Sequence, residues 1–217
     1  MWQELPRLLP EAIGQTLEMV AVSATVASLA GVPLGVVLYA TERGHFLQSL
    51  ALNRVLGSLV NATRSTPFII LMVAIIPLTR ALVGTSIGTK AAIVPLTLAA
   101  APFIARIVEG ALREVDGGLI EAARAMGATP LQIVLKVLLP EARPAIVGGI
   151  TLAAISLIGY SAMAGAVGGG GLGDLGIRYG YERFELDVMF ATVAVLIVLV
   201  QLVQFAGDRI VRRLTHK

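Results

Sequence analysis

Few side chains in this sequence have the chemistry of a catalytic or cofactor site. The chain has no cysteine, which excludes disulfides and thiol catalysis. Its two histidines, His45 and His216, both lie outside the apolar runs. Gly168, Gly170 and Gly173 satisfy the pattern G-x-G-x-x-G, but they follow a long uncharged run rather than a strand, so a dinucleotide site is not predicted. No Walker A sequence is present, and we predict that the chain does not itself hydrolyse ATP.

The composition is that of a protein surrounded by lipid. Of 217 residues, 56% are hydrophobic and 14% are charged, and the mean hydropathy is +0.84. Soluble domains carry about 25% charged residues, and a soluble chain of this length could not cover so much apolar surface. The net charge of +3 does not indicate nucleic-acid binding, because the positive residues lie at the ends of apolar runs and in the connections between them.

Five apolar regions are long enough to cross a bilayer, which requires about 20 residues per helix. They cover approximately residues 15–41, 57–82, 90–112, 142–167 and 187–208. Each should be helical, because backbone polar groups cannot remain unpaired in lipid and the apolar runs lack the alternation of a transmembrane strand. The predicted fold class is an all-α, polytopic membrane protein with five transmembrane helices in a single domain, residues 1–217.

The distribution of Lys and Arg predicts the orientation of these helices. One side would hold eleven positive residues, which are Arg43, Arg54, Arg106, Arg113, Arg124, Lys136, Arg143, Arg209, Arg212, Arg213 and Lys217. The other would hold five, which are Arg7, Arg80, Lys90, Arg178 and Arg183. Because cytoplasmic loops carry the excess, the N-terminus is predicted outside and the C-terminus in the cytoplasm. Arg64 remains within the membrane, where we hypothesise an ion pair with Glu109.

Two other kinds of membrane protein fit the sequence less well. An intramembrane enzyme would need histidine, cysteine, lysine or paired carboxylates at bilayer depth, and we identify none there. An ion-coupled secondary transporter would need intramembrane ionisable residues, and the acidic candidate near a span, Glu18, lies close to the outer end. We therefore predict no catalytic, metal-binding or cofactor-binding residues on this chain, and the secondary transporter remains a remote alternative.

Polar and glycine residues of the fourth span have both a packing and a transport interpretation. One set lies near a single helix face by its spacing and consists of Ser156, Tyr160, Ser161 and Met163. This stripe either faces a translocation path or hydrogen-bonds to a neighbouring helix. A second set, just beyond, consists of Gly168, Gly169, Gly170, Gly171 and Gly173. These glycines predict a flexible cap or a close helix crossing, with an outer gate as the functional hypothesis.

Small residues and prolines elsewhere also indicate how the helices pack. Gly31 and Gly35, four residues apart, predict close helix packing first and a dimer contact second. Kinks, as hinges or for packing, are predicted at Pro67, Pro77, Pro95 and Pro102.

The longest cytoplasmic connection, about residues 117–138, predicts two short helices joined by a tight turn. Leu119–Met126 is rich in alanine and favours a helix, which Gly127 would end in the left-handed conformation. Thr129 and Gln132 form a capping-box pattern at the start of a second helix. The exposed top is predicted to consist of Ala122, Ala123, Ala125, Met126 and Ala128. Such small side chains suit the close docking of another protein.

The same segment resembles the EAA motif of ABC importer permeases. Glu121-Ala122-Ala123 is followed after three residues by Gly127 and after nine more by Val137-x-Leu139-Pro140, where the family prefers isoleucine at position 137. Other pieces resemble the methionine-uptake type of this family, and they are Val83–Gly88, Ala92–Thr97, Ala101–Arg106, Gly159–Met163 and Gln204–Arg212. The resemblance covers most of the chain beyond residue 60.

This resemblance implies a type I importer permease that moves methionine, in D and L forms, without chemistry of its own. Another amino acid or a small polar solute is the alternative substrate. The loop would be the coupling helix that docks on an ATP-hydrolysing subunit, through Glu121, Ala122, Ala123, Ala125, Met126, Gly127, Ala128 and Thr129. Within that set, Glu121 would act as a polar anchor at the base of the hairpin.

The resemblance also implies the partners and the location. The partners would be a second copy of the chain, two ATP-binding cassette subunits, an extracytoplasmic methionine-binding protein that meets the outer gate, and membrane lipid. Pairing is expected as well because five helices are few for a solute path. ATP and Mg²⁺ would bind the partner ATPase and no cofactor would bind this chain, which would lie in the cytoplasmic (inner) membrane.

Overall fold

The computed structural model describes residues 5–215, which fold into helices joined by short connections. Residues 1–4 of the predicted domain, and His216 and Lys217 at its end, lie outside the described residues. The long and medium helices are α1 (Leu5–Ala40), α2 (Leu50–Ser65), α5 (Thr89–Arg113), α8 (Leu139–Ala164) and α10 (Leu186–Thr215). The short ones are α3 (Phe68–Ala74), α4 (Ile76–Val83), α6 (Gly117–Ala125), α7 (Pro130–Ile133) and α9 (Gly171–Leu175), and the π-helical turns are η1 (Val134–Leu138), η2 (Gly165–Gly169) and η3 (Gly176–Tyr181).

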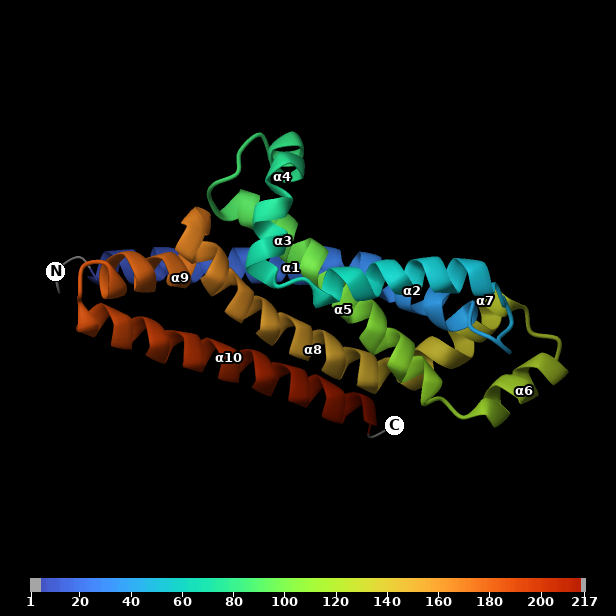
Figure 1. Ribbon diagram of the computed structural model, residues 1–217. Helices are drawn as coiled ribbons and strands as arrows, with labels where there is room; N and C mark the ends of the chain where they lie inside the picture. Colours follow the sequence, from blue (N-terminus) through green and yellow to red (C-terminus); the bar gives the residue numbers. More distant parts are fainter. Residues whose placement is uncertain (1–4, 216–217) are drawn as a thin grey trace.

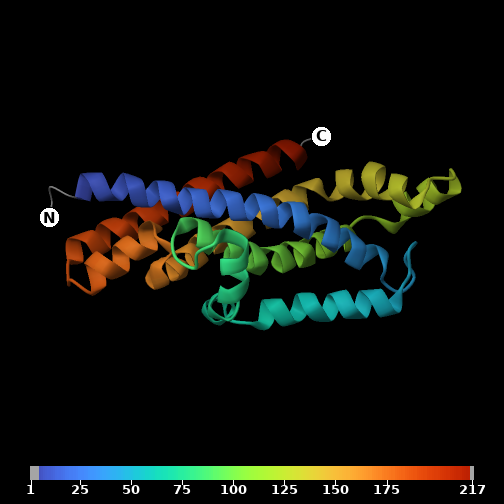
Figure 2. The same cartoon turned by 90° about the horizontal axis from the view of Figure 1, so that it is seen from above.

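The long helices run along one elongated bundle (Figures 1 and 2). Helix α5 packs against α1 and α8, and α10 packs against α8. Helices α6 and α7 lie at the end of the bundle opposite the described N-terminal end of α1, and α3 and α4 project sideways from it (Figure 1). The core between α1, α5 and α8 is apolar and includes the fully buried Leu96, Ile104, Val108 and Leu157.

Within residues 5–215, four helices are long and apolar enough to span a membrane, and a bent pair, α2 with α3, makes a fifth candidate. They cover Pro6–Ala40, Thr89–Arg113, Pro130–Gly169 and Leu186–Thr215. The predicted all-α membrane fold is therefore confirmed.

The second predicted span, 57–82, is divided among α2, α3 and α4, with breaks close to Pro67 and Pro77, where kinks are predicted. Helix α2 ends at Ser65, and α3 leaves it at an angle of 107°. Pro67 disfavours helical geometry at the residue before it, and Thr66 is accordingly extended, with φ −82° and ψ 125°. Helix α4 then begins at Ile76 and accommodates Pro77 in its first turn. By contrast, Pro95 and Pro102 lie within the continuous α5.

The crossing of α1 and α5 depends on glycine, as the spacing of Gly31 and Gly35 predicts. A Cβ at Gly31 would lie 2.7 Å from the carbonyl oxygen of Ala101, and one at Gly35 would lie 2.5 Å from that of Ala105. No side chain fits at such distances from backbone atoms. The interpretation as close packing within the chain is confirmed.

Candidate functional site

The hairpin at the α6 end of the bundle is closed by local hydrogen bonds. The Asp116 side chain caps α6 by accepting from the Gly118 amide at 2.8 Å. Gly127 adopts φ +78°, the predicted left-handed residue, and its amide donates to Arg124 O at 2.9 Å. The first bond defines the start of α6 and the second closes the turn that follows it, so the hairpin has a defined shape.

The second helix of the hairpin continues directly into a membrane span. The predicted capping box is present, since Thr129 N donates to Gln132 Oε1 at 2.8 Å and Gln132 N donates to Thr129 Oγ1 at 3.4 Å. From Pro130 the helix continues through η1 into α8. Pro140 has no amide hydrogen to donate to the preceding turn, and its ring crowds the carbonyl groups of that turn. The wider π-helical turn η1, which lies just before Pro140, relieves this crowding.

The outer surface of the hairpin differs from the prediction at one residue. Most of the predicted residues are exposed or half-buried, and Met126 is 82% exposed. Ala123 is only 4% exposed, and its placement on the exposed top is wrong. Its methyl group belongs to the apolar core, against which Ala128 also packs. No hydrogen bond or ion pair within residues 5–215 involves the Glu121 carboxylate, so its predicted role as an anchor has no partner among these residues.

An ionic cluster lies just before the hairpin, on the last turns of α5. Glu109 is 2% exposed and accepts from Arg106 Nη1 and Arg113 Nη2, each at 2.6 Å. Arg113 also donates to both oxygens of Glu42, at 3.1 Å each. The signal for the first two pairs is in the sequence, because residues three and four apart share a helix face. Glu42 carries no such signal, since it is distant along the chain.

The hypothesised pair between Arg64 and Glu109 is wrong. The carboxylate of Glu109 is occupied by the two arginines of its own helix. The Arg64 guanidinium instead lies over the ring of Phe103, 5.9 Å from its centroid. An exposed position on α2 lets Arg64 do this without a carboxylate partner.

The glycine cluster at the opposite end forms a close helix crossing rather than a flexible cap. Gly168, Gly170 and Gly171 have φ of +92°, +80° and +78°, which reverse the chain between α8 and α9. The reversal is bonded to α1, because Gly171 N donates to Gln15 Oε1 at 2.7 Å and Leu172 N donates to Thr16 Oγ1 at 2.9 Å. Sequence reasoning missed Gln15 and Thr16, which have no local pattern.

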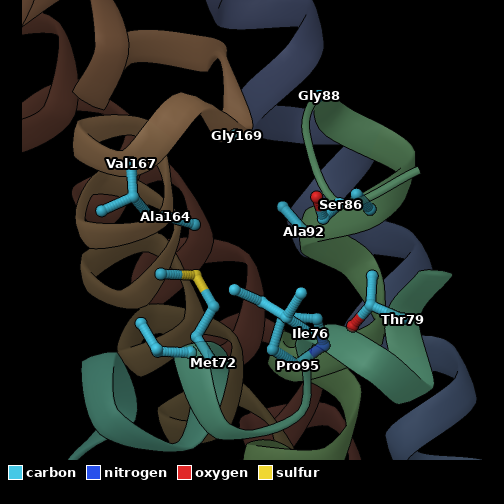
Figure 3. Close-up of a pocket in the computed structure, with 12 residues that line it drawn as sticks. Met72, Ile76, Thr79, Ser86, Gly88, Ala92, Pro95, Ala164, Val167 and Gly169 are labelled. Carbon is cyan, nitrogen blue, oxygen red and sulfur yellow. The ribbon is translucent and has the colours of Figure 1, made fainter.

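A cavity of about 70 Å³ lies beside this reversal. It is lined by residues of α3, α4, α5, α8 and η2, and in Figure 3 Ala164 and Val167 lie across it from Ala92 of α5. Its lining is largely apolar and includes Met72, Ile76, Pro95, Ala164 and Val167, with Thr79 and Ser86 as the polar side chains. In Figure 3, Met72 and Ile76 extend into the space in front of Ala164.

The predicted stripe on α8 is divided by the fold. Tyr160 stacks on Phe68 of α3, with ring centroids 4.8 Å apart and planes at 8°. Ser156 is half-buried and Met163 is 49% exposed. Ser161 is 1% exposed and donates to Ile158 O at 2.7 Å within its own helix, so its inclusion in the stripe is wrong. The reason is rotation about the helix axis, since consecutive residues differ by about 100°.

The exposed hairpin thus continues directly into a helix that is long and apolar enough to span a membrane. A family model described as "Binding-protein-dependent transport system inner membrane component" matches residues 31–216. The chain belongs to this family. As an inner-membrane transport component it is a permease rather than an enzyme.

Named relatives within this permease family match the chain over nearly its whole length. The probable D-methionine transport system permease protein MetI of Vibrio cholerae is 57% identical and covers 97% of this chain and 93% of its own. The D-methionine transport system permease protein MetI of Escherichia coli K12 is 56% identical, with 97% of each chain covered.

Solved structures of such permeases share the fold. A chain in a structure of inward-facing conformations of the MetNI methionine ABC transporter matches with a TM-score of 0.97, 54% identity and 99% of both chains covered. A chain of an amino acid ABC transporter solved with histidines has a TM-score of 0.80 at 19% identity, which indicates the common fold alone.

Proposed function

We propose that this chain is the transmembrane subunit of an ATP-driven importer that carries methionine, in both D and L forms, across the cytoplasmic membrane. The observation that carries this proposal is the near-complete match to the permease relatives named for D-methionine transport and to a chain of the methionine ABC transporter. The whole chain, residues 1–217, would act as one permease domain. ATP and Mg²⁺ would bind a partner subunit, and no cofactor would bind here.

The hairpin is the proposed docking element for an ATP-binding cassette subunit. Its exposed alanines let a partner's groove approach closely, and Met126 supplies an apolar knob that is 82% exposed. The docking residues would be Glu121, Ala122, Ala125, Met126, Gly127, Ala128 and Thr129, with Ala123 supporting them from beneath. Because the hairpin continues into α8 without a break, its displacement would move that span directly.

A second copy of the chain would complete the solute path. Helices α3 and α4 project from the bundle with exposed apolar residues that include Ile70, Val73 and Leu82, and a single chain leaves this face uncovered. The path would run along Ser156, Tyr160 and Met163 of α8. Two chains would carry two hairpins and so engage two ATPase subunits.

The outer end of the assembly would receive substrate from a methionine-binding protein. The N-terminus would lie outside and the C-terminus in the cytoplasm, in agreement with the distribution of positive residues. Gly168, Gly169, Gly170, Gly171 and Gly173 would act as the outer gate, hydrogen-bonded to α1 in this conformation. ATP binding would draw the two hairpins together and rock the spans, which would open this gate and close the inner side.

Reconstitution provides the direct test of this function. The chain would be purified with its ATPase partner, placed in liposomes with a methionine-binding protein, and assayed with labelled L- and D-methionine. We expect uptake that requires ATP and is competed by unlabelled methionine. Preferential uptake of another amino acid or small polar solute would replace the substrate, and uptake driven by a proton gradient without an ATPase would overturn the proposal.

The orientation can be tested by labelling single cysteines, because the chain contains none. Ile87 is 67% exposed in the loop before α5, and Met126 is 82% exposed on the hairpin. In intact cells that express the chain without an ATPase partner, an impermeant maleimide is expected to label Ile87→Cys directly and Met126→Cys only after permeabilisation. The reverse pattern would put the hairpin beyond reach of a cytoplasmic ATPase.

The path residues predict a graded effect on uptake. Tyr160→Ala removes a stacked pair, an interaction worth about 0.5–1.5 kcal/mol, and should lower ATP-driven uptake by about two- to tenfold. Tyr160→Phe keeps the stacking on Phe68 and should transport nearly as well as the unmodified chain. Ser161→Ala should also have little effect, because that hydroxyl bonds only within its helix. A larger loss from Ser161→Ala than from Tyr160→Ala would exclude this path.

A further inference from the structure

A buried carboxylate lies between two arginines near the hairpin, and the proposed docking and path do not use it. Glu109 is 2% exposed, and both its oxygens accept charge-assisted bonds at 2.6 Å, from Arg106 and Arg113. Withdrawing an ion pair from water is unfavourable and contributes little to stability compared with apolar packing. The cluster is therefore better explained by a role in positioning the segments around it than by its contribution to stability.

The first connection of the cluster, through Arg113, joins α5 to the turn between α1 and α2. Arg113 is the last residue of α5 and binds both oxygens of Glu42 at 3.1 Å, a forked geometry that defines direction as well as distance. The turn is itself held in shape, since Asn53 Nδ2 donates to Leu38 O at 2.7 Å and Ser49 N donates to Thr41 O at 3.0 Å. A displacement of the end of α5 is thus passed to an ordered turn.

The same turn also contacts the hairpin. The guanidinium of Arg124, on α6, lies 6.0 Å from the centroid of the Phe46 ring, which packs against the core. Helix α6 begins at Gly117, only a few residues after Arg113. The hairpin is therefore connected to the turn both through space and through the end of α5.

The second connection of the cluster, through Arg106, joins α5 to α2. Arg106 Nη2 donates to Gly57 O at 3.0 Å, and a Cβ at Gly57 would lie 3.2 Å from the same nitrogen, so glycine gives this contact room. Within α2, all of which is described, Val60 is the one buried residue. Beside this bond, α2 is attached through a small apolar cluster in which Val60 and Leu56 pack with Leu38 and Ala105. Helix α2 leads to α3, which lines the cavity with Met72.

We propose that Glu109 is a positioning residue that links the movement of the hairpin to α2 and the turn between α1 and α2. Its carboxylate neutralises Arg106 and Arg113 together and holds each arginine on its distant partner. Without the charge, the two guanidinium groups repel each other and release α2 and Glu42. The hairpin then moves with α5 and α8 alone, and ATP turnover no longer moves the side of the path formed by α3. The proposal rests on the proposed function and identifies which segments of the chain move together with the hairpin.

The test measures methionine imported per ATP hydrolysed in the reconstituted complex. Glu109→Gln keeps the shape and removes the charge, and we expect the ratio to fall about tenfold, the scale of coupling between distant sites. Complex assembly and ATP hydrolysis should stay within about twofold of the unmodified complex. Glu109→Asp, which keeps the charge, should recover part of the ratio. The matched control is Asp174→Asn, which neutralises the exposed pair with Arg178, 2.7 Å long, at the other end of the bundle.

The outcomes distinguish a positioning role of Glu109 from a purely structural one. An unchanged ratio in Glu109→Gln, or a loss of uptake in proportion to lost complex, overturns the proposal in favour of a purely structural role. If Glu109→Gln does not assemble, Glu42→Gln, at a partly exposed site, decides instead: a fall in the ratio supports the proposal and no change overturns it. Absence of ATP-driven methionine uptake by the unmodified complex would instead overturn the proposed function itself.

Discussion

Gly173→Ala is expected to destabilise the protein by about 3 kcal/mol, the upper end for overpacking, and to reduce the amount of assembled complex. The added methyl group would overlap the carbonyl oxygen and the Cα of Ala162 on α8. Both are backbone atoms, so no change of rotamer can relieve the overlap. The two segments cannot separate easily either, because the amides of Gly171 and Leu172 are bonded to α1.

The measurement is thermal unfolding in detergent, where we expect the midpoint to fall by about 6–12 °C. Gly159→Ala is the matched control, because it adds the same methyl group on α8 with no atom within 4 Å. Replacing a helical glycine there should be neutral or slightly stabilising. Equal midpoints for Gly173→Ala and the unmodified chain would contradict the close crossing as described.

Gly127→Val is expected to reduce ATP-driven uptake strongly while leaving the protein folded. Gly127 has φ +78°, a conformation that costs an L-residue roughly 1–2 kcal/mol and a β-branched one more. The strain is confined to the turn, since no atom lies within 4 Å of the added Cβ. A cost of that size lowers the share of hairpins with the docking shape by about 5- to 30-fold, and uptake should fall on the same scale.

Two further variants separate turn geometry from the volume of the side chain. Gly127→Asn should restore most of the uptake, because asparagine tolerates the left-handed conformation. Gly117→Val places the same side chain on α6, where no atom lies within 4 Å, and should leave docking intact. Co-purification of the ATPase measures docking in each case. Full co-purification and uptake in Gly127→Val would show that the turn is not needed.

Where prediction from the sequence succeeded, the interactions were local. The hairpin is the clearest case, because Gly127, Thr129 and Gln132 act within a few residues of one another and their geometry is as predicted. The apolar runs also led to the right fold class, since the requirement to pair backbone groups in lipid leaves helices as the solution. The kink predicted at Pro67 is also present, as the break between α2 and α3, because the restriction on the residue before a proline is local.

Where prediction from the sequence failed, the burial or pairing of a residue depended on which neighbouring segment covers its helix face. Glu109 was paired with Arg64, yet its partners are Arg106 and Arg113, with Glu42 brought to them by the fold. In the same way, Ala123 and Ser161 were assigned to functional surfaces and are buried.

The sequence by itself determined the membrane helices, the capped hairpin and the family, because these depend on hydrophobicity, backbone preference and motif spacing along the chain. The tertiary structure alone decided the partners of Glu109, the bonding of the glycine reversal to Gln15 and Thr16, and the division of the stripe on α8. The physical reason is that helix periodicity specifies which residues share a face, whereas burial and pairing depend on the neighbouring helix, which the local pattern does not identify.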